Sequence, residues 1–462
     1  MRSKKKIVIS VALVFLLLLA GVFIYFKFFA SSSKIQNIIS SSVATFSKIS
    51  QFLPIADDTK KETAVIGQLV EHFNAQDNQE RSYLLLLQNN MELRPGGGFL
   101  GQYAVVKIKN GQVTYSFFED ANLLDQRITV KVAPPYPFQR MMSIKKWKFS
   151  NSNFSPDFPT NVDKAKYFYK LGRGAANFDG VIAINASVLN RVLEIIGPVT
   201  VNNVEYNSQN AVLKLEEQVE KAYLFNEDLD TQNRKWIMKE MAKIILDRLM
   251  KLQNIPKLAD FTLNELRNKD VMLNFQDSAL QEKAESVGWA GKINTTWDKD
   301  YLAVVDANMG ALKSDYYIKR EMDYSIDLTL PKPVVTLKIK YTHTATAGDW
   351  RTSDYHSYLR VYVPQGANLL ERKMVSYPNI QEELGKTYFC FILHTLIGRS
   401  TEALIKYELP EKYKENYQLL IQKQSGVGDV PITLHLKDQN GEVSQSSVLK
   451  KDLNFTLQEK VQ

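Results

Sequence analysis

Apolar residues follow two different patterns along the chain, and the change falls near residue 314. Before it, short unbroken apolar runs, such as residues 83–87 and 181–184, alternate with stretches of helical period. An unbroken run of this length is typical of a strand that is buried on both faces. Because such strands alternate with helices, the pattern predicts an α/β domain over residues 81–313, a sheet with flanking helices.

Within this domain, residues 103–108 and 113–118 flank the pair Asn110-Gly111 and predict a β-hairpin. Helices are expected at residues 162–171, 186–196, 211–225 and 234–252. Thr160 is expected to cap the first of them, and Gly197-Pro198 ends the second. The last is the longest and most regular, with its apolar residues on one helical face.

Beyond residue 314 the pattern changes to period two. Residues 334–341 alternate between apolar and polar side chains, which is typical of a half-buried strand. Further strands are expected at residues 358–363, 388–393, 403–407, 417–421, 432–436 and 446–449. Several short strands with turn residues between them predict an all-β antiparallel sandwich over residues 314–462.

The N-terminus has a third pattern, an apolar stretch of twenty residues, 7–26, in which Ser10 is the only strongly polar side chain. As a helix it rises about 30 Å, the thickness of a bilayer's hydrocarbon core. Arg2 and the lysines at 4–6 precede it, and only Lys27 closely follows it. This bias predicts a cytoplasmic basic tail and a single transmembrane signal anchor in residues 1–29, with the C-terminal ectodomain outside the cytoplasmic membrane.

Residues 30–80 connect the anchor to the first domain. Apolar residues recur at helical spacing before Pro54, and a second helical stretch covers residues 62–73. The segment is expected to form a helical stalk, or else an extension packed on the first domain.

Charge, cysteine and histidine content narrow the function classes. The net charge is +8, and the four cations before the anchor leave 8 − 4 = +4 for the rest of the chain. Such a small surplus does not favour a nucleic-acid partner. The single cysteine, Cys390, stands among apolar residues and is expected to be a buried thiol. The five histidines show no i,i+4 pair, so their spacing predicts no metal cluster.

The glycine-rich stretch ELRPGGGFLG, residues 92–101, is the first candidate site. Gly96, Gly97 and Gly98 let the backbone approach a ligand closely, and Arg94 can donate two parallel hydrogen bonds to phosphate oxygens. The alternative is a connection between two strands, with Arg94 in a structural ion pair.

The second candidate is the acid-rich stretch at residues 227–235. Asp228 and Asp230 could hold Mg²⁺, while Arg234 and Lys235 grip a pyrophosphate. The alternative is that the acids favour the N-terminus of the following helix. Two more acidic groups, within residues 119–125 and 306–315, could bind a cation or act as local turn acceptors. The aromatic loop at 146–158 could stack on sugars or fill a core.

Several stretches resemble a family of bacterial membrane proteins known by its domain of unknown function 4012. They are LLLLQNNMELRPGGGFLGQYAVV, NSNFSPDFPTN, FDGVIAINASVLNRVLEIIGPVTV, VVDANMGALKSDYYIKR, YLRVYVPQGANLL and LLIQKQSGVG. The resemblance covers most of the chain after residue 82. It implies a location and an architecture but no activity.

A more distant resemblance is to the LytR-CpsA-Psr family, carried in order by residues 84–87, FDGVIAINASVLNRVLEIIGPVTV and DLDTQNRKWIMKEMAKIILDRL. That family transfers glycopolymers from polyprenyl-pyrophosphate carriers to peptidoglycan, usually with magnesium. The resemblance implies catalytic roles for Arg94, Asp228, Asp230 and Arg234. Where that family has an acid after its first arginine, this chain has Pro95-Gly96-Gly97.

Two functions therefore stand side by side. The chain is expected to be a membrane-anchored, extracytoplasmic cell-envelope protein that binds or transfers a polyprenyl-pyrophosphate-linked glycopolymer through its α/β domain. The alternative is a non-catalytic envelope protein whose β-sandwich contacts other surface components. In both cases the expected partners are the membrane bilayer and a lipid-linked glycan or cell-wall polymer.

Overall fold

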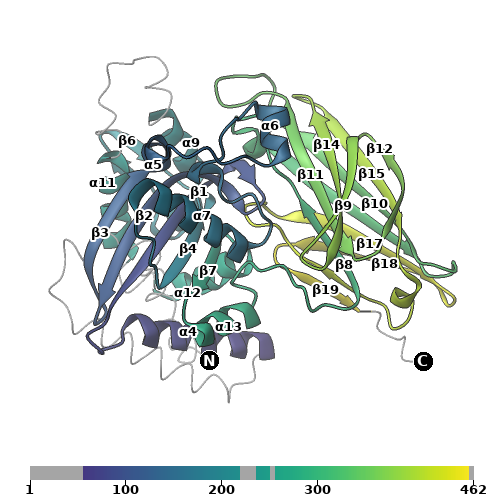
Figure 1. Ribbon diagram of the computed structural model, residues 1–462, viewed down its shortest axis with the longest axis horizontal. Coiled ribbons are helices and arrows are strands. Elements are labelled where there is room, and N and C mark those ends of the chain that lie inside the picture. Colours follow the sequence, from purple (N-terminus) through teal and green to yellow (C-terminus); the bar gives the residue numbers. More distant parts are fainter. Residues whose placement is uncertain (1–55, 219–235, 250–254, 457–462) are drawn as a thin grey trace. The chain divides into compact units, whose positions relative to one another are not determined.

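The computed structural model describes residues 56–218, 236–249 and 255–456 (Figure 1). The predicted anchor, the first part of the predicted stalk and the acid-rich stretch 227–235 lie outside these residues. Among the described helices, none is long and apolar enough to span a membrane. The chain divides into two compact units: the first comprises residues up to 88, 100–127 and 172–291, and the second comprises 89–99, 128–171 and 292 onward.

The first unit has the mixed α/β composition that the pattern predicts, around a five-stranded sheet of order β3-β2-β1-β4-β7. The strands are β1 (Glu80–Arg94), β2 (Gly97–Lys109), β3 (Gln112–Asp120), β4 (Gly180–Asn185) and β7 (Val271–Phe275). β1 and β4 pair in parallel, with Tyr83 opposite Gly180, whereas β3 and β7 pair antiparallel with their neighbours. The predicted hairpin is β2–β3, where Asn110 and Gly111 have φ of 51° and 73°, as a type I′ turn requires.

One hydrophobic core joins this sheet to six helices of the first unit. They are α4 (Asp57–Phe73), α8 (Ser187–Ile196), α9 (Ala211–Glu216), α11 (Trp236–Leu249), α12 (Ile255–Arg267) and α13 (Ser278–Ser286), beside the small ribbon of β5 (Val199–Val201) and β6 (Val204–Tyr206). α5 (Ala121–Arg127) follows β3 directly and lies against it. α4 lies against α13 (Figure 1) and buries Ile66, Leu69 and Phe73 in this core. The segment at residues 30–80 was predicted to be a stalk or a packed extension, and residues 57–73 form a helix that packs on the first unit.

Helix α7 (Phe158–Arg173) confirms the predicted helix at 162–171, but it begins two residues before the predicted cap. Thr160 lies inside the helix and donates its backbone N–H to the Asp157 carboxylate at 3.1 Å. Asp157, not Thr160, is thus the acceptor at the N-terminus, because its side chain can reach back to the free amide of the first turn.

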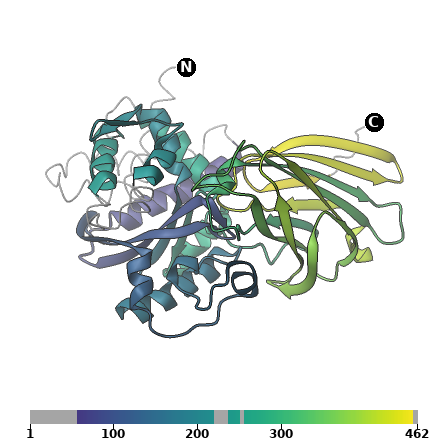
Figure 2. The ribbon, with the colours of Figure 1, turned by 90° about the horizontal axis from the view of Figure 1, so that it is seen from above.

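The second unit is β-rich and has two six-stranded sheets (Figures 1 and 2). One has the order β12 (Asn368–Lys373), β15 (Ser400–Glu408), β10 (Val334–His343), β9 (Ile318–Asp327), β17 (Val430–Asp438), β18 (Gly441–Leu449). The other has the order β13 (Ser376–Glu383), β14 (Lys386–Thr395), β11 (Tyr355–Pro364), β8 (Asp300–Val305), β16 (Gln418–Ile421), β19 (Leu453–Thr456). Side chains from both sheets form one core, and the burial of β10 alternates as its period-two pattern predicts.

Two details of the second unit differ from the prediction. Most pairings are antiparallel, but β16 runs parallel to β8, and β17 runs parallel to β9. In both cases a strand from the C-terminal part of the chain pairs with one from the start of the unit and runs in the same direction. In addition, β8 lies before the predicted boundary at residue 314, and its backbone pairs with β11 and β16 of the second unit.

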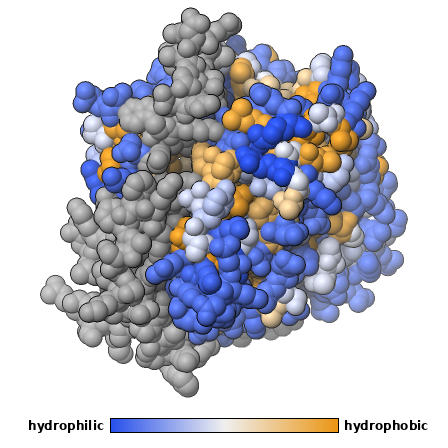
Figure 3. Space-filling view, turned by 60° about the vertical axis from the view of Figure 1, so that its left-hand side comes forward, coloured by the Kyte–Doolittle hydropathy of each residue, from blue (hydrophilic) through white to orange (hydrophobic). Residues whose placement is uncertain are grey.

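The aromatic loop at residues 146–158 lies in a longer segment of the second unit, residues 128–171, which also contains α6 (Tyr136–Met142) and η3 (Phe149–Asn151). Phe138 and Phe154 share a hydrophobic cluster with Tyr358 of β11 and Tyr388 of β14. The core-filling interpretation of this loop is confirmed. Hydrophilic residues cover much of the surface of the face in Figure 3, and hydrophobic ones are interspersed among them.

Candidate functional site

Arg94, the arginine of the glycine-rich stretch, ends β1 and has only 1% of its surface exposed. Its guanidinium donates from Nη2 to the Glu92 carboxylate at 2.6 Å and from Nε to Asn151 Oδ1 at 3.1 Å. Nη1 donates to the backbone oxygens of Asn308 at 2.9 Å and Leu93 at 3.2 Å. All three nitrogens therefore donate within the second unit, and an anion would have to displace these acceptors.

The glycines of this stretch permit close approach between segments of the chain. A Cβ on Gly96 would lie 2.3 Å from the Asn161 amide nitrogen, and a Cβ on Gly98 would lie 2.3 Å from the backbone carbon of Asn89. Gly97 has a φ of 126°, in the region that side chains disfavour. These contacts favour a tightly packed connection between two strands over a phosphate cradle.

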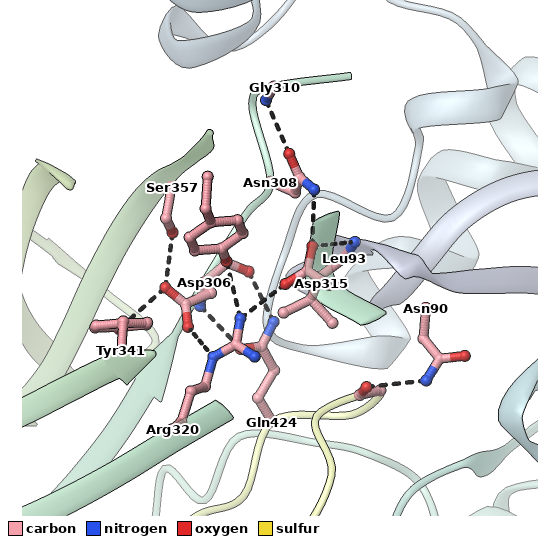
Figure 4. Close-up of polar contacts among 12 residues, drawn as sticks. Asn90, Leu93, Asp306, Asn308, Gly310, Asp315, Arg320, Tyr341, Ser357 and Gln424 are labelled. Carbon is pink, nitrogen blue, oxygen red and sulfur yellow. Dashed lines mark hydrogen bonds and ion pairs between the residues drawn. The ribbon is translucent and has the colours of Figure 1, made fainter. Parts of the chain in front are cut away.

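The acidic group at residues 306–315 is joined to Arg320 of β9 (Figure 4). Arg320 donates from Nε to Asp306 at 2.8 Å and from Nη2 to Asp315 and the Tyr355 hydroxyl, both at 2.8 Å. Burial works against the charge, but Tyr355, Asp306 and Asp315 hold the pKa of Arg320 well above its ordinary value. The cation that these acids bind is thus the side chain of Arg320.

Ser357 and Tyr341 complete the shell of Asp306. The hydroxyl of Ser357 donates to Asp306 Oδ1 at 2.7 Å, and that of Tyr341 donates to the same oxygen at 3.2 Å. A buried carboxylate with this many donors is satisfied without a metal or ligand.

Gln424 and Asp315 tie three distant segments together (Figure 4). Gln424 donates from Nε2 to the backbone oxygens of Arg94 at 3.1 Å and Asp306 at 2.8 Å, and its Oε1 accepts from the Asp306 amide at 2.8 Å. Asp315 accepts from the Leu93 amide at 3.0 Å. Asn90 donates to the Gly426 oxygen at 3.0 Å. We call this set of contacts among residues 89–98, 306–320 and 422–427 the buried polar network.

A small cavity lies beside the buried polar network, with Asp306, Arg320 and Gln424 among its lining residues. Its volume of about 20 Å³ is room for one water-sized guest. A sugar or a pyrophosphate does not fit there, so the arrangement holds backbone segments together rather than a substrate.

The remaining predicted site residues, Asp228, Asp230, Arg234 and Lys235, lie outside the described residues. Their roles stay predictions, as does a magnesium ion on the two aspartates. Where the structure describes the chain, it holds no group of three or more His, Cys, Asp or Glu side chains placed to bind a metal.

The first acid after the hairpin, Glu119, is also paired. Glu119 accepts from Arg173 at 2.7 Å, from Arg127 at 3.2 Å and from the Tyr103 hydroxyl. Burial alone would raise the pKa of Glu119, but these donors lower it below its usual value. The carboxylate is thus charged and occupied by two arginines.

A second polar cluster, which the sequence interpretation missed, lies in the first unit just beyond the carboxyl end of β4. Arg191 of α8 donates to Glu265 at 2.5 Å and to Asp270 at 2.6 Å, and Asn185 donates to Asp270 at 2.9 Å. About a third of the Arg191 side chain, 32%, is exposed. Ligands of open α/β sheets bind at the carboxyl ends of strands. The sequence signal that could have identified this cluster is Arg191 on α8, the helix that directly follows the buried strand β4.

A histidine pair on the second unit was also missed. His356 of β11 and His394 of β14 are direct partners across the two strands, and their Nδ1 atoms are in contact. Burial and the nearby His394 lower the pKa of His356. The two residues are far apart in sequence, so only the strand register reveals the pair.

Comparison with known proteins supports one of the two resemblances. Residues 78–219 match a family described as "Protein of unknown function (DUF4012)". No curated protein matches the chain. Among solved structures, that of the Lin1025 protein from Listeria innocua is similar over 46% of this chain and 80% of that one, at 13% identity and a TM-score of 0.24. A score this low carries no argument about fold or function, and the LytR-CpsA-Psr resemblance stays a prediction.

Proposed function

We propose that the chain is a non-catalytic binding protein of the bacterial cell envelope, anchored by its N-terminal segment in the cytoplasmic membrane and active outside it. The apolar span and the cation bias of residues 1–29 support the location. The β-rich second unit is the part that meets other envelope components.

The observation that carries the non-catalytic assignment is the state of Arg94. A residue that binds pyrophosphate needs free N–H groups directed at the anion. Nε, Nη1 and Nη2 of Arg94 instead donate to four acceptors within the second unit, and the side chain is buried. The arginine that the distant resemblance would use for catalysis therefore has a structural task.

The location can be tested with the single cysteine of the chain. Cys390 is fully buried, and burial raises the pKa of its thiol, so a thiol reagent should leave the folded parent protein unlabelled. A Gln445→Cys variant places a thiol on the exposed strand β18. A membrane-impermeant maleimide should label this variant on intact cells, while a Ser3→Cys variant should react only after lysis. The opposite labelling pattern rejects the proposed orientation.

The absence of catalysis is tested with the full chain in detergent. Incubated with a polyprenyl-pyrophosphate-linked glycan, an acceptor glycan and Mg²⁺, the protein is expected to transfer nothing, yet to bind the cell-wall polymer in a sedimentation assay. Transfer that requires Mg²⁺ and is abolished by Asp228→Ala or Asp230→Ala would overturn the proposal.

Transfer of a lipid-linked glycopolymer is the second candidate. The observation that favours it is the partly exposed Arg191 beyond the carboxyl end of β4, where open α/β sheets bind ligands. In that case an Arg191→Gln variant should lose activity. Arg81→Gln is the matched control, because Arg81 pairs with the exposed Asp77 at the opposite, amino end of the parallel strand β1. An inactive parent protein in the assay above sets this candidate aside.

A further inference from the structure

We propose that His356 and His394 form a binding site for one divalent transition-metal ion of the Zn²⁺, Ni²⁺ and Cu²⁺ class on the surface of the second unit. The first argument is register. The two residues are direct partners in the antiparallel pair β11–β14, so their side chains leave the sheet on the same face. Their ring centroids are 4.6 Å apart, and their Nδ1 atoms face one another.

The second argument is the fixed backbone on both sides of the pair. The His356 carbonyl accepts from the Met309 amide at 2.8 Å, and the His394 carbonyl accepts from the Thr401 hydroxyl at 2.9 Å. The strands continue in unbroken register on one side of the pair to Pro364 and Lys386. A site carried by two hydrogen-bonded strands needs little ordering when an ion arrives.

The third argument is access. His394 is exposed and His356 is half-buried, so an ion can reach both imidazoles from solvent. Gly310 faces the His356 ring, where a Cβ would lie 3.6 Å from its Cδ2, and its lack of a side chain leaves room beside the pair.

The fourth argument is the chemistry of the donor set. Imidazole nitrogen is a preferred ligand of Zn²⁺, Ni²⁺ and Cu²⁺, with metal–nitrogen bonds of about 2.0–2.1 Å for zinc. At a tetrahedral angle, two such bonds place the nitrogens about 3.3 Å apart. The two Nδ1 atoms are already in contact, so a small opening of the side-chain torsions admits the ion. The two nitrogens bind as neutral imidazoles, and water supplies the other positions.

Asp354 lies two residues before His356 and contributes negative charge near the pair rather than a third ligand, since the described residues hold no group of three metal-binding side chains. Its Oδ1 accepts from the Ile397 amide at 2.9 Å, which holds the carboxylate close to both strands. Its charge acts on the His356 imidazole. A carboxylate next to the pair also offsets part of the charge of a divalent cation.

The experiment uses the full chain in detergent, purified with a tag free of histidine and stripped with a chelator. Titration with ZnSO₄ and NiCl₂ in a calorimeter should show one equivalent bound. His356→Ala and His394→Ala should each weaken the affinity by about tenfold or more, because each removes half of the protein's nitrogen ligands.

His435→Ala is the matched control. This histidine is also partly exposed on a strand, but its ring contacts Ser444 at 2.7 Å and Asp323 at 3.1 Å rather than a second histidine. Its replacement should leave the metal affinity unchanged. His394→Gln, which keeps a polar side chain of similar reach, guards against misfolding of the alanine variants.

Two results would overturn the proposal. One is the absence of heat or of a metal-dependent rise in melting temperature up to millimolar metal, which leaves His356 and His394 as a hydrogen-bonded pair only. The other is equal affinity in the parent, His356→Ala and His394→Gln proteins. Neither result bears on the proposed envelope function, because the labelling and transfer assays do not depend on these histidines.

Discussion

Replacing Arg94 with alanine is expected to destabilise the second unit strongly. The side chain is buried and holds four acceptors, which come from residues 92–93, 151 and 308. In Arg94→Ala the carboxylate of Glu92, whose side chain is only 10% exposed, loses its guanidinium partner. The Asn308 oxygen and the Asn151 amide lose a charged donor at the same time.

The size of the effect follows from the buried ion pair. Removing one partner of such a pair costs about 3–5 kcal/mol, because the other charge stays behind without compensation. We expect a loss of that order in the free energy of unfolding of this unit. Arg94→Lys keeps the charge but not the planar fork, and should cost about 1–3 kcal/mol. Adding Glu92→Gln to Arg94→Ala should restore part of the loss, since glutamine needs no counter-charge.

Hydrogen exchange followed by mass spectrometry suits a chain with two units, because a single unfolding transition is not assured. Peptides that cover residues 306–315 and 418–427 should exchange about a hundredfold faster in Arg94→Ala, the equivalent of about 3 kcal/mol. Peptides from residues 271–286 of the first unit serve as the internal control. Suppose instead that exchange is unchanged while binding of polyprenyl pyrophosphate disappears. Arg94 would then be a ligand-binding residue, and the structural reasoning would be refuted.

Three further predictions concern other parts of the chain. Leu69→Ala should lower the free energy of unfolding of the first unit by about 2–5 kcal/mol, because this fully buried side chain holds α4 in the core. Chemical unfolding measures the change, and a value near zero would mean that α4 is not packed on the first unit. Gly98→Ala should hinder folding because its Cβ would meet the Asn89 backbone at 2.3 Å, whereas Gly101→Ala, with nothing within 4 Å, should express and melt like the parent. Burial raises the pKa of Asp300 to about 6, above the 3.8 of the unfolded chain, so its contribution to stability is fully present below about pH 4 and is lost as the pH rises through 6. Between pH 4 and 7 the free energy of unfolding of Asp300→Asn should accordingly rise by up to about 3 kcal/mol relative to that of the parent, as measured by melting at each pH. A difference that does not change with pH would contradict the assignment.

The strands and helices with strong periodicity were predictable, and those at the edges were not. The apolar run at residues 83–87 and the apolar–polar alternation at 334–341 match the burial patterns of β1 and β10, so each predicted its strand. By contrast, β13 contains Pro378, lies at the edge of its sheet and shows no alternation of burial. Pattern reasoning depends on a buried face, and this strand has none.

The candidate site was predictable only as a set of segments. The stretches singled out in the sequence include Arg94, Asp306, Arg320 and Gln424, of which only Arg94 lies within the family match at residues 78–219, and the structure brings them together. Their contacts could not be foreseen, because sequence separation does not indicate which segment meets which. Sequence spacing likewise indicates metal-binding histidines only when they are close in sequence, such as one helical turn apart. His356 and His394 are 38 residues apart and become neighbours only through the register of β11 and β14.

The parallel pairings in the second unit have a consequence for how the chain reaches its native state. β8 and β9 lie inside their sheets, and each is flanked by a strand from the far end of the chain, β16 or β17. A ribosome-bound intermediate that stops before residue 418 therefore lacks the outer two strands of each sheet, so that β8 and β9 are left as unpaired edges. The backbone oxygen of Arg94 also lacks its donor, Gln424, which lies 330 residues later. Long-range closure of this kind is slow. The second unit is therefore expected to complete its sheets late, and a product truncated before residue 418 would expose the edges of β8 and β9 to chaperones and proteases.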